Sequence, residues 1–194
     1  VRGKSSILML ILSGLVVAAL FSSLISLVKF AADPQDELPA VTFWLMGSLT
    51  GSDWKTLQLG LPFIVFGSLV IWLLRWKLNA LSLTEEEAKS LGLPVARLRF
   101  LIVACATAVT AACVSMCGLI GWVGLLIPHF VRLAVGSDNR IVVPASFIYG
   151  ALFLLACDTI ARSAAQMEIP VSVLTSLVGA PIFLMLLRRK STFL

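Results

Sequence analysis

The sequence is 194 residues long, and 59% of it is hydrophobic against 13% charged, with a mean hydropathy of +1.03. This composition excludes a soluble globular domain and indicates a polytopic helical membrane protein, with no room for a soluble catalytic domain beside the spans. The net charge of +5 does not imply nucleic acid, because Lys and Arg beside membrane spans commonly produce such a balance.

Six apolar stretches have about the 20 residues that a helix needs to cross a bilayer. We therefore predict an all-α polytopic membrane protein with six transmembrane helices, in chain order Ile7–Val28, Leu57–Trp76, Leu98–Cys117, Leu119–Val135, Ile141–Ile160 and Ile169–Leu187. An even number of spans places both ends of the chain on the same side of the membrane.

The long polar stretch Asn79–Pro94, between the second and third spans, gives the expected orientation. If this stretch is cytoplasmic, twelve of the fifteen Lys and Arg residues lie inside, and only Lys29, Lys55 and Arg162 lie outside. Cytoplasmic loops of membrane proteins carry an excess of Lys and Arg. We therefore predict that both chain ends and the polar stretch face the cytoplasm.

The polar stretch has the signals of a short capped helix. Thr84 can act as the N-cap with Glu87 three residues later, which is the capping-box spacing, and the first turn is acidic. Gly92 suits the position just after a helix, and Pro94 prevents its continuation. A defined helix in such a loop favours a docking element, and a plain polar connector is the alternative.

The stretch Phe30–Lys55, between the first two spans, is expected outside. Its apolar middle, Val41–Leu49, is too short to cross a bilayer and is predicted as a short helix at the outer face. Two interpretations remain open. Tryptophans such as Trp44 anchor the segment at the membrane interface, or the segment, with Met46 and Ser48, lines the outer mouth of a path.

No motif predicts an enzyme, a cofactor or a metal site. His129 is the only histidine and follows Pro128, and we expect its imidazole to bond a carbonyl that the proline leaves free. Cys105, Cys113 and Cys117 fall near one face of one helix, where packing between helices is the expected role.

Two further patterns indicate local structure. Gly118, Gly121 and Gly124 predict a tight hairpin with close helix contact. Asp158 and Arg162 are four residues apart with the acid first, which favours a helical ion pair. The alternative is that Arg162 offers its positive charge to an external protein.

The six predicted spans have no Asp, Glu, Lys or Arg at their centres. Carriers coupled to protons or sodium usually need an ionisable group at membrane depth. This pattern disfavours a secondary carrier or a channel, which remains the alternative function. Energy for transport would have to come from another subunit, and the capped cytoplasmic helix is the expected place to receive it.

Five stretches in a fixed order carry a family resemblance: FWLMGSLTGSDW (Phe43–Trp54), LNALSLTEEEAKSLGL (Leu78–Leu93), GLIGWVGLLIPHFVRLAVGSDNRIVVPAS (Gly118–Ser146), DTIAR (Asp158–Arg162) and EIPVSVLTSLVGAPIFLMLLRR (Glu168–Arg189). Together they resemble the FecCD family, the permeases of importers for iron–siderophore complexes, haem and cobalamin. Thr84, Leu119 and Trp122 depart from the residues usual in that family without disturbing the expected architecture.

The resemblance implies that residues 1–194 are the C-terminal six spans of a ten-span permease domain, which agrees with a start at Val1. It implies that the cytoplasmic loop docks into an ABC ATPase subunit through Leu81, Thr84, Glu85, Glu86, Glu87, Ala88, Leu91 and Gly92. It places Trp44, Met46 and Ser48 beside the passage. The remaining matched positions are expected to be structural: Gly118, Gly121, Gly124, Pro128, His129, Arg132, Asp158, Glu168, Pro170, Gly179 and Pro181.

The resemblance also implies the partners and the setting. Arg162 would dock a periplasmic or lipid-anchored substrate-binding protein, and a second permease copy or a paralogue would complete the passage. The expected function is a non-enzymatic permease subunit of a binding-protein-dependent ABC importer in the bacterial plasma membrane. Iron(III)–siderophore is the expected substrate, no cofactor is implied, and membrane lipid is the expected surrounding.

Overall fold

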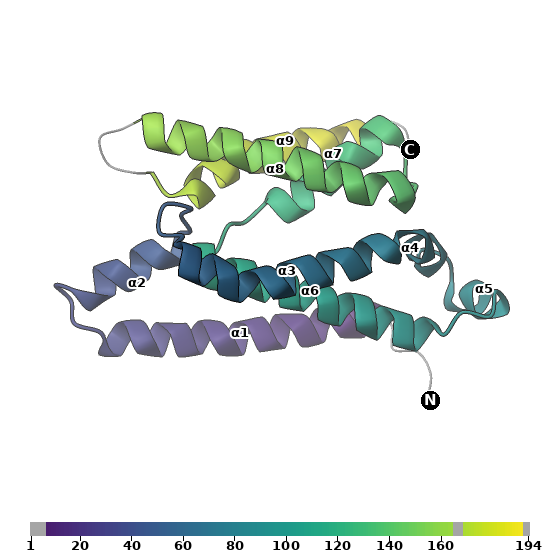
Figure 1. Ribbon diagram of the computed structural model, residues 1–194, viewed down its shortest axis with the longest axis horizontal. Coiled ribbons are helices and arrows are strands. Elements are labelled where there is room, and N and C mark those ends of the chain that lie inside the picture. The colour runs from purple at the N-terminus through teal and green to yellow at the C-terminus, as the bar shows by residue number, and fades with distance from the viewer. Residues whose placement is uncertain (1–6, 165–168, 192–194) are drawn as a thin grey trace. The chain divides into compact units, whose positions relative to one another are not determined.

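The computed structural model describes residues 7–164 and 169–191, apart from the side chains of residues 7, 8, 85, 89 and 187–191. All regular elements in these residues are helices, which confirms the predicted all-α class (Figure 1). They are α1 (Ile7–Ala31), α2 (Glu37–Leu45), α3 (Trp54–Leu73), α4 (Arg75–Leu81), α5 (Glu85–Ser90), α6 (Val95–Cys117), α7 (Val123–Val135), α8 (Asn139–Ser163) and α9 (Val171–Ser191).

The chain divides into two units, residues 1–43 and residues 44–194. The first unit holds α1 and most of α2. Glu37 lies in the first turn of α2, where its carboxylate accepts a hydrogen bond from the backbone N–H of Asp33 (3.3 Å). The short helix predicted over 41–49 is observed at Glu37–Leu45, which is four residues earlier in the chain. Pro39 is tolerated because the first backbone N–H groups of a helix have no partner within it.

Four of the described helices, α1, α3, α6 and α8, are long and apolar enough to cross a membrane. Helix α7 falls below that length, and so does the part of α9 whose side chains the structure describes, Val171–Leu186. At 13 residues α7 is about 20 Å long, against about 30 Å of hydrocarbon. The structure therefore supports a helical membrane protein with four full-length spanning helices, and the predicted count of six is not confirmed.

The predicted fourth span differs from the structure for a local reason. It was expected from Leu119, but α7 begins only at Val123. Gly118 has φ +70° and Trp122 has φ +68°, and both values are incompatible with a right-handed helix. Residues 118–122, between the end of α6 and the start of α7, therefore form an irregular link.

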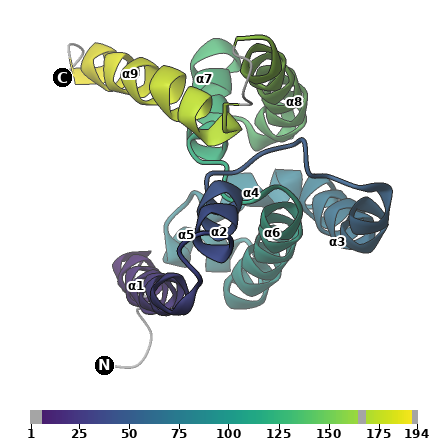
Figure 2. The same ribbon diagram turned by 90° about the vertical axis from the view of Figure 1, so that its left-hand side faces the viewer.

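The second unit contains two groups of helices (Figures 1 and 2). Helix α3 packs along α6, and the two buried glycines of α3 face this neighbour. A Cβ on Gly60 would lie 2.5 Å from the Met116 sulfur, and one on Gly67 would lie 2.5 Å from the Val109 side chain. Small residues of this kind let two helices approach closely inside a membrane.

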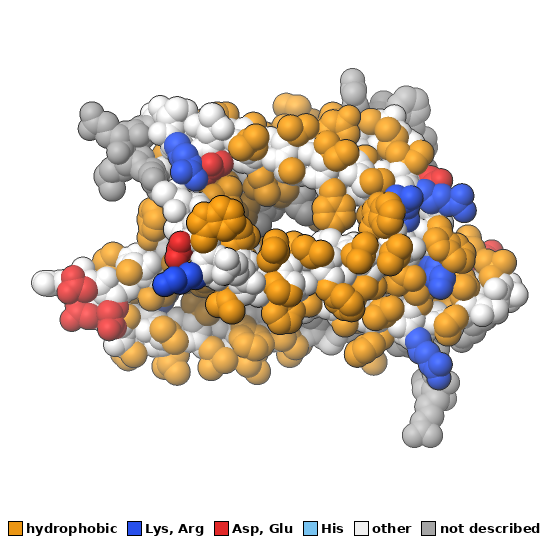
Figure 3. Space-filling view, viewed as in Figure 1, with side chains coloured by type: hydrophobic (Ala, Val, Ile, Leu, Met, Phe, Trp, Pro, Cys, Tyr) orange, Lys and Arg blue, Asp and Glu red, His pale blue; other side chains and the backbone are white. Residues whose placement is uncertain are grey.

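The second group is formed by α7, α8 and α9, which contact one another. Ile127, Val131 and Val142 form one buried cluster between α7 and α8. Cys157 and Val171 belong to a second cluster, between α8 and α9. Elsewhere most large apolar side chains are exposed, and charged side chains gather toward the helix ends (Figure 3). Such a surface suits lipid or neighbouring subunits rather than water.

Candidate functional site

The six-residue helix α5 carries the capping box that the sequence predicts. The carboxylate of Glu87 accepts hydrogen bonds from the backbone N–H (2.9 Å) and the hydroxyl (2.7 Å) of Thr84. The backbone N–H of Glu87 donates in return to the Thr84 hydroxyl at 3.4 Å. The Thr84 hydroxyl and then the Thr84 N–H lower the pKa of Glu87, because both bonds stabilise the carboxylate.

The C-terminal end of α5 also follows the predicted pattern. The backbone N–H of Leu91 donates to the carbonyl of Glu87, and Gly92 has φ +72°, the left-handed conformation that closes many helices. Helix α5 contacts α4 and α6, and Ala88 is only 1% exposed. Glu86 remains exposed, so α5 is held on one face and open on another.

These observations bring the expected docking residues together at one end of the unit, on α5 and its two flanks (Figure 1). Leu81 closes α4, Thr84 caps α5, and Gly92 ends the turn after it. The side chain of Glu85 lies outside the described residues. The partner that these residues bind remains a prediction.

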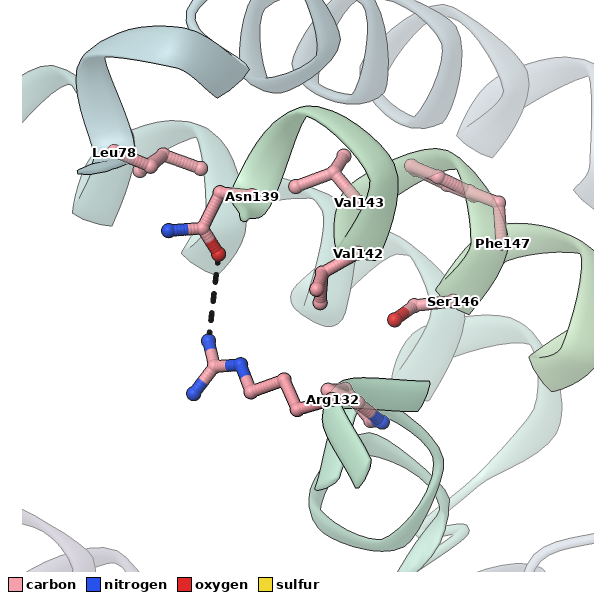
Figure 4. A pocket seen from close by; sticks show the side chains of 8 residues that line it. Leu78, Arg132, Asn139, Val142, Val143, Ser146 and Phe147 are labelled. Carbon is pink, nitrogen blue, oxygen red and sulfur yellow. Dashed lines mark hydrogen bonds between the residues drawn. The ribbon is translucent and has the colours of Figure 1, made fainter. Parts of the chain in front are cut away.

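A polar junction, formed by Asn79, Asp138, Asn139 and Arg132, joins α4 to α8 and α7. The Asn79 amide donates to a carboxylate oxygen of Asp138 (2.7 Å) and accepts from the backbone N–H of Asn139 (2.8 Å). The Asn139 amide oxygen in turn accepts from the Arg132 guanidinium at 3.5 Å (Figure 4). Arg132, expected to be structural, thus links the end of α7 to the start of α8.

Asp138 is also the N-cap of α8. Its carboxylate accepts from the backbone N–H of Arg140 at 2.9 Å. This bond, followed by the Asn79 amide, lowers the pKa of Asp138 because both donors stabilise the charged form. Sequence reasoning missed the role of Asn79, because its partner Asp138 lies 59 residues away.

A cavity of ≈ 310 Å³ opens beside the polar junction, between α4, α7 and α8. Leu78, Pro128 and Phe147 contribute apolar walls, and the Arg132 and Asn139 side chains lie at one end (Figure 4). Within the described part of the chain, the buried hydroxyl oxygen of Ser146, also on the wall, has no hydrogen-bond partner. Packing between α4 and α8 is therefore incomplete next to the polar bonds.

At the opposite end of the second unit, Gly47 and Gly118 form a backbone junction with the start of α9. The backbone N–H of Val171 donates to the Gly47 carbonyl (3.0 Å), and the N–H of Ser48 donates to the Cys117 carbonyl (2.9 Å). A Cβ on Gly118 would lie only 2.1 Å from the Trp44 carbonyl oxygen.

The residues expected beside the passage lie in or near this backbone junction. The Met46 carbonyl accepts a hydrogen bond from the Ser172 hydroxyl, and Ser48 follows Gly47 in the turn after α2. The side chains of Trp44 and Met46 are exposed, whereas that of Ser48 is partly buried. Their expected place beside the passage remains a prediction.

The predicted ion pair at the end of α8 is confirmed. The Arg162 guanidinium lies 2.8 Å from the Asp158 carboxylate, with 47% of the Arg162 side chain and 15% of the Asp158 side chain exposed. Glu168 lies outside the described residues. Pro170 directly precedes α9, and its carbonyl accepts from the backbone N–H of Val173 (3.0 Å).

The other positions expected to be structural have mixed surroundings. Within the described residues, a Cβ on Gly121 or Gly124 would meet no atom closer than 4 Å, so the predicted close contact occurs at Gly118 alone. A Cβ on Gly179 would lie 3.0 Å from the Trp122 side chain, and Pro181 lies inside α9.

The expected bond of His129 to a backbone carbonyl is not seen for its Nε2 atom, which is buried without a partner among the described residues. The ring instead packs edge-on against Phe183, with 5.7 Å between ring centroids. Across the described chain, no three His, Cys, Asp or Glu side chains gather as metal ligands would.

Comparison with known proteins gives a consistent family. The model of the FecCD transport family matches residues 1–189. The molybdate import system permease protein MolB of Haemophilus influenzae is 44% identical over 93% of this chain and 53% of its own length. The cobalamin import system permease protein BtuC of Halobacterium salinarum is 43% identical over 96% of this chain and 50% of its own.

A solved structure supports the same relationship. It is an ABC transporter assigned to the metal-chelate type, in an inward-facing conformation, and it matches with a TM-score of 0.91 and 42% identity over 95% of this chain and 60% of that one. The chain spans about half the length of the curated relatives it matches.

Proposed function

Because the chain belongs to the FecCD transport family, we propose that it forms part of the permease subunit of a binding-protein-dependent ABC importer. The observation that carries this proposal is α5, a capped helix that connects α4 to a long apolar helix and presents an exposed acidic face. A permease driven by a separate ATPase needs such a rigid contact, since a flexible connector would absorb the displacement it has to transmit.

The ATPase subunit is the proposed occupant of the α5 surface. The capping box fixes the start of α5, and burial of Ala88 fixes its rotation against the neighbouring helices. Exposed Glu86 and Leu91 would then face the ATPase cleft. ATP binding would draw two ATPase subunits together, and coupling requires that α5 make different contacts in the two ATPase states.

The remaining partners follow from the proposed orientation. The polar junction and both ends of the chain would face the cytoplasm of a bacterium, as the Lys and Arg distribution favours. Arg162 and the end of α8 would face outward, toward an acidic surface of the substrate-binding protein. A second permease copy or a paralogue would complete the passage beside Trp44, Met46 and Ser48.

The proposal includes six crossings. Helix α7 would cross together with the irregular link 118–122, and α9 would provide the last crossing. Irregular backbone at membrane depth is tolerated where protein surrounds it. Gly118 lies against Trp44 and Gly47, and Gly47 lies against Leu119, so the start of the link has protein beside it.

Iron(III)–siderophore is the substrate class that we propose. The matching structure of the metal-chelate type supports a bulky metal complex, and the relatives named for molybdate and cobalamin define the competitors to test. Uptake of radiolabelled ferric siderophore, cobalamin and molybdate would be measured in proteoliposomes that contain the complete permease with its ATPase and binding protein. The compound that is imported identifies the substrate class. ATP-dependent uptake of molybdate or cobalamin alone would refute the siderophore assignment and leave the importer assignment intact.

Crosslinking tests the contact with the ATPase. In the complete permease, on a background without Cys105, Cys113, Cys117 and Cys157, we would introduce Glu86→Cys at the exposed face of α5. Burial of Ala88 makes that neighbouring position unsuitable. A crosslink to the co-expressed ATPase that changes with ATP is expected, and the exposed control Thr50→Cys should give none. An accessible Glu86→Cys that never meets the ATPase would contradict the proposal.

A further inference from the structure

We infer that Asn79 is a positioning residue that transmits the displacement of α5 to α8 and α7. This inference rests on the proposed function, because it assumes that an ATPase moves α5. Asn79 belongs to α4 and precedes the α5 cap, Thr84, by only five residues. It therefore lies between the surface that would receive the force and the helices that would have to move.

The Asn79 side chain uses both ends of its amide across this interface. The nitrogen donates to Asp138, and the oxygen accepts from the backbone N–H of Asn139, at 2.7 and 2.8 Å. The first N–H groups of a helix have no partner within it. Asn79 thus supplies from α4 a second cap for α8, in addition to the cap that Asp138 itself provides.

The link continues into α7. Asn139 is buried at 7% exposure, and its own amide oxygen accepts from Arg132 in the last turn of α7. A displacement of Asn79 therefore acts on the end of one helix and the start of the next at the same point.

Within the described residues, Asn79 makes the only side-chain hydrogen bonds found between α4 and the start of α8. Apolar contact between α4 and α8 is interrupted by the ≈ 310 Å³ cavity beside Leu78 and Phe147. A tightly packed interface would move as one body without polar help. Beside the cavity, the hydrogen bonds of Asn79 supply a contact that apolar packing does not supply at that point.

The chemistry of the bond requires an amide at position 79. The position needs a donor toward a carboxylate and an acceptor toward an N–H group, and Asn provides both. Asn79→Asp removes the donor and places two carboxylates face to face. Asp138→Asn keeps an acceptor oxygen for both Asn79 and Arg140. In the double variant the amide and the carboxylate have exchanged places, so the bond between positions 79 and 138 can form again with its direction reversed. The Arg140 N–H, which in the wild type donates to the same Asp138 oxygen as Asn79, does not regain its acceptor in that arrangement.

The test measures coupling in the complete permease, assembled with its ATPase and binding protein in proteoliposomes. The readout is the number of ATP molecules hydrolysed per substrate imported. We expect Asn79→Asp to raise this ratio about tenfold, a common size for coupling between sites, while ATP hydrolysis continues. Asp138→Asn should stay within about twofold of wild type, and the exchange N79D/D138N should bring the ratio back toward the wild-type value, because the bond between positions 79 and 138 forms again.

A matched control comes from the same connection. Ser82 is the C-cap of α4, and among the described residues its hydroxyl bonds only the Leu78 carbonyl of α4, at 3.2 Å. Ser82→Ala should leave the ratio unchanged. If Asn79→Asp does not assemble, Asn79→Ala, which removes both bonds without adding a charge, takes its place and should raise the ratio in the same direction.

The outcomes separate this inference from the proposed function. If the wild-type complex imports no substrate with ATP, the importer assignment fails. If wild type couples normally and Asn79→Asp and Asn79→Ala do too, the inference is wrong. It is also wrong if these variants lower hydrolysis and import in equal proportion, because a merely structural role would do that. It is equally wrong if the exchange N79D/D138N leaves the ratio as high as Asn79→Asp alone does, because the bond between positions 79 and 138 would then not matter for coupling.

Discussion

The second unit is held at its two ends by two different kinds of contact. At the polar junction, α4 meets α8 through the side chains of Asn79 and Asp138. At the backbone junction, the turn after α2 meets the end of α6 and the start of α9 through main-chain groups and two glycines. The polar junction is formed by side chains beside a cavity, whereas the backbone junction is formed by main-chain groups in close contact.

This difference indicates where motion and rigidity lie. Gly47 and Gly118 both have positive φ. A Cβ on Gly47 would collide with the backbone of Leu119, and a Cβ on Gly118 would collide with the backbone of Trp44. Backbone atoms cannot move aside as flexible side chains do, so the geometry is fixed. We therefore expect the backbone junction to act as the pivot and the polar junction to be the end that moves.

The largest effect is expected for Gly118→Ala. The new Cβ would lie 2.1 Å from the Trp44 carbonyl oxygen, and φ +70° is itself strained for alanine. We expect the free energy of unfolding in detergent to fall by about 3 kcal/mol. The control Gly121→Ala, where the Cβ meets nothing within 4 Å, should be close to neutral. Equal losses in both variants would contradict the close contact at Gly118.

The second prediction compares two glycines at the contact between α3 and α6. One would meet backbone atoms if it carried a Cβ, and the other would meet a flexible side chain. A Cβ on Gly67 would lie 3.0 Å from the Cys105 backbone oxygen, besides its contact with Val109, whereas one on Gly60 meets mainly the flexible Met116 side chain. We expect Gly67→Ala to cost about 2 kcal/mol of unfolding free energy and Gly60→Ala about half as much. The reverse order would show that side-chain flexibility does not decide the cost.

The third prediction concerns single hydrogen bonds at the two junctions. Asn79→Ala leaves the buried N–H of Asn139 without its cap, which should cost about 1 kcal/mol. Ser172→Ala removes the hydroxyl bond to Met46, but the backbone bond between Val171 and Gly47 remains. Its cost should therefore stay below about 0.5 kcal/mol. Thermal unfolding in the same detergent compares the two variants. A larger loss of stability for Ser172→Ala than for Asn79→Ala would show that side-chain bonds matter more at the backbone junction than at the polar junction, contrary to our expectation.

The smallest effect is expected from acid. The pKa of Asp138 is lowered in the folded state, so its contribution to stability is complete above the ordinary carboxyl pKa near 4 and is lost as the pH falls through the lowered value. Hydrogen exchange, corrected for intrinsic rate, should then speed up at the Arg140 N–H, which donates to the Asp138 carboxylate. The Val171 N–H, bonded to a backbone carbonyl, should not change. Parallel changes at both amides would indicate general loosening instead.

Sequence reasoning succeeded where the determining contacts are local. The capping box of Thr84 and Glu87 and the pair of Asp158 and Arg162 span three and four residues, and both are observed. The helices α3, α6 and α8 lie within a few residues of the predicted spans, because apolar length alone determines them.

The failures share a different cause. The late start of α7 follows from the positive φ of Trp122, a residue whose type gives no warning of it. The role of Asn79 depends on partners 59 and 60 residues away, and the glycine collision at Gly118 depends on Trp44. Contacts of this kind arise only when distant segments meet, so no local pattern could indicate them.

The exposed apolar faces of α1, α3, α6 and α8 have an evolutionary consequence. Lipid tails do not distinguish among leucine, isoleucine, valine and phenylalanine as a packed core does. Substitutions among these residues on the lipid side should be nearly neutral, and such positions should drift freely. Selection would then act chiefly on a few points, among them Gly67, Asn79 and Gly118. A distant relative would be recognised more safely by these sparse fixed positions than by its overall likeness.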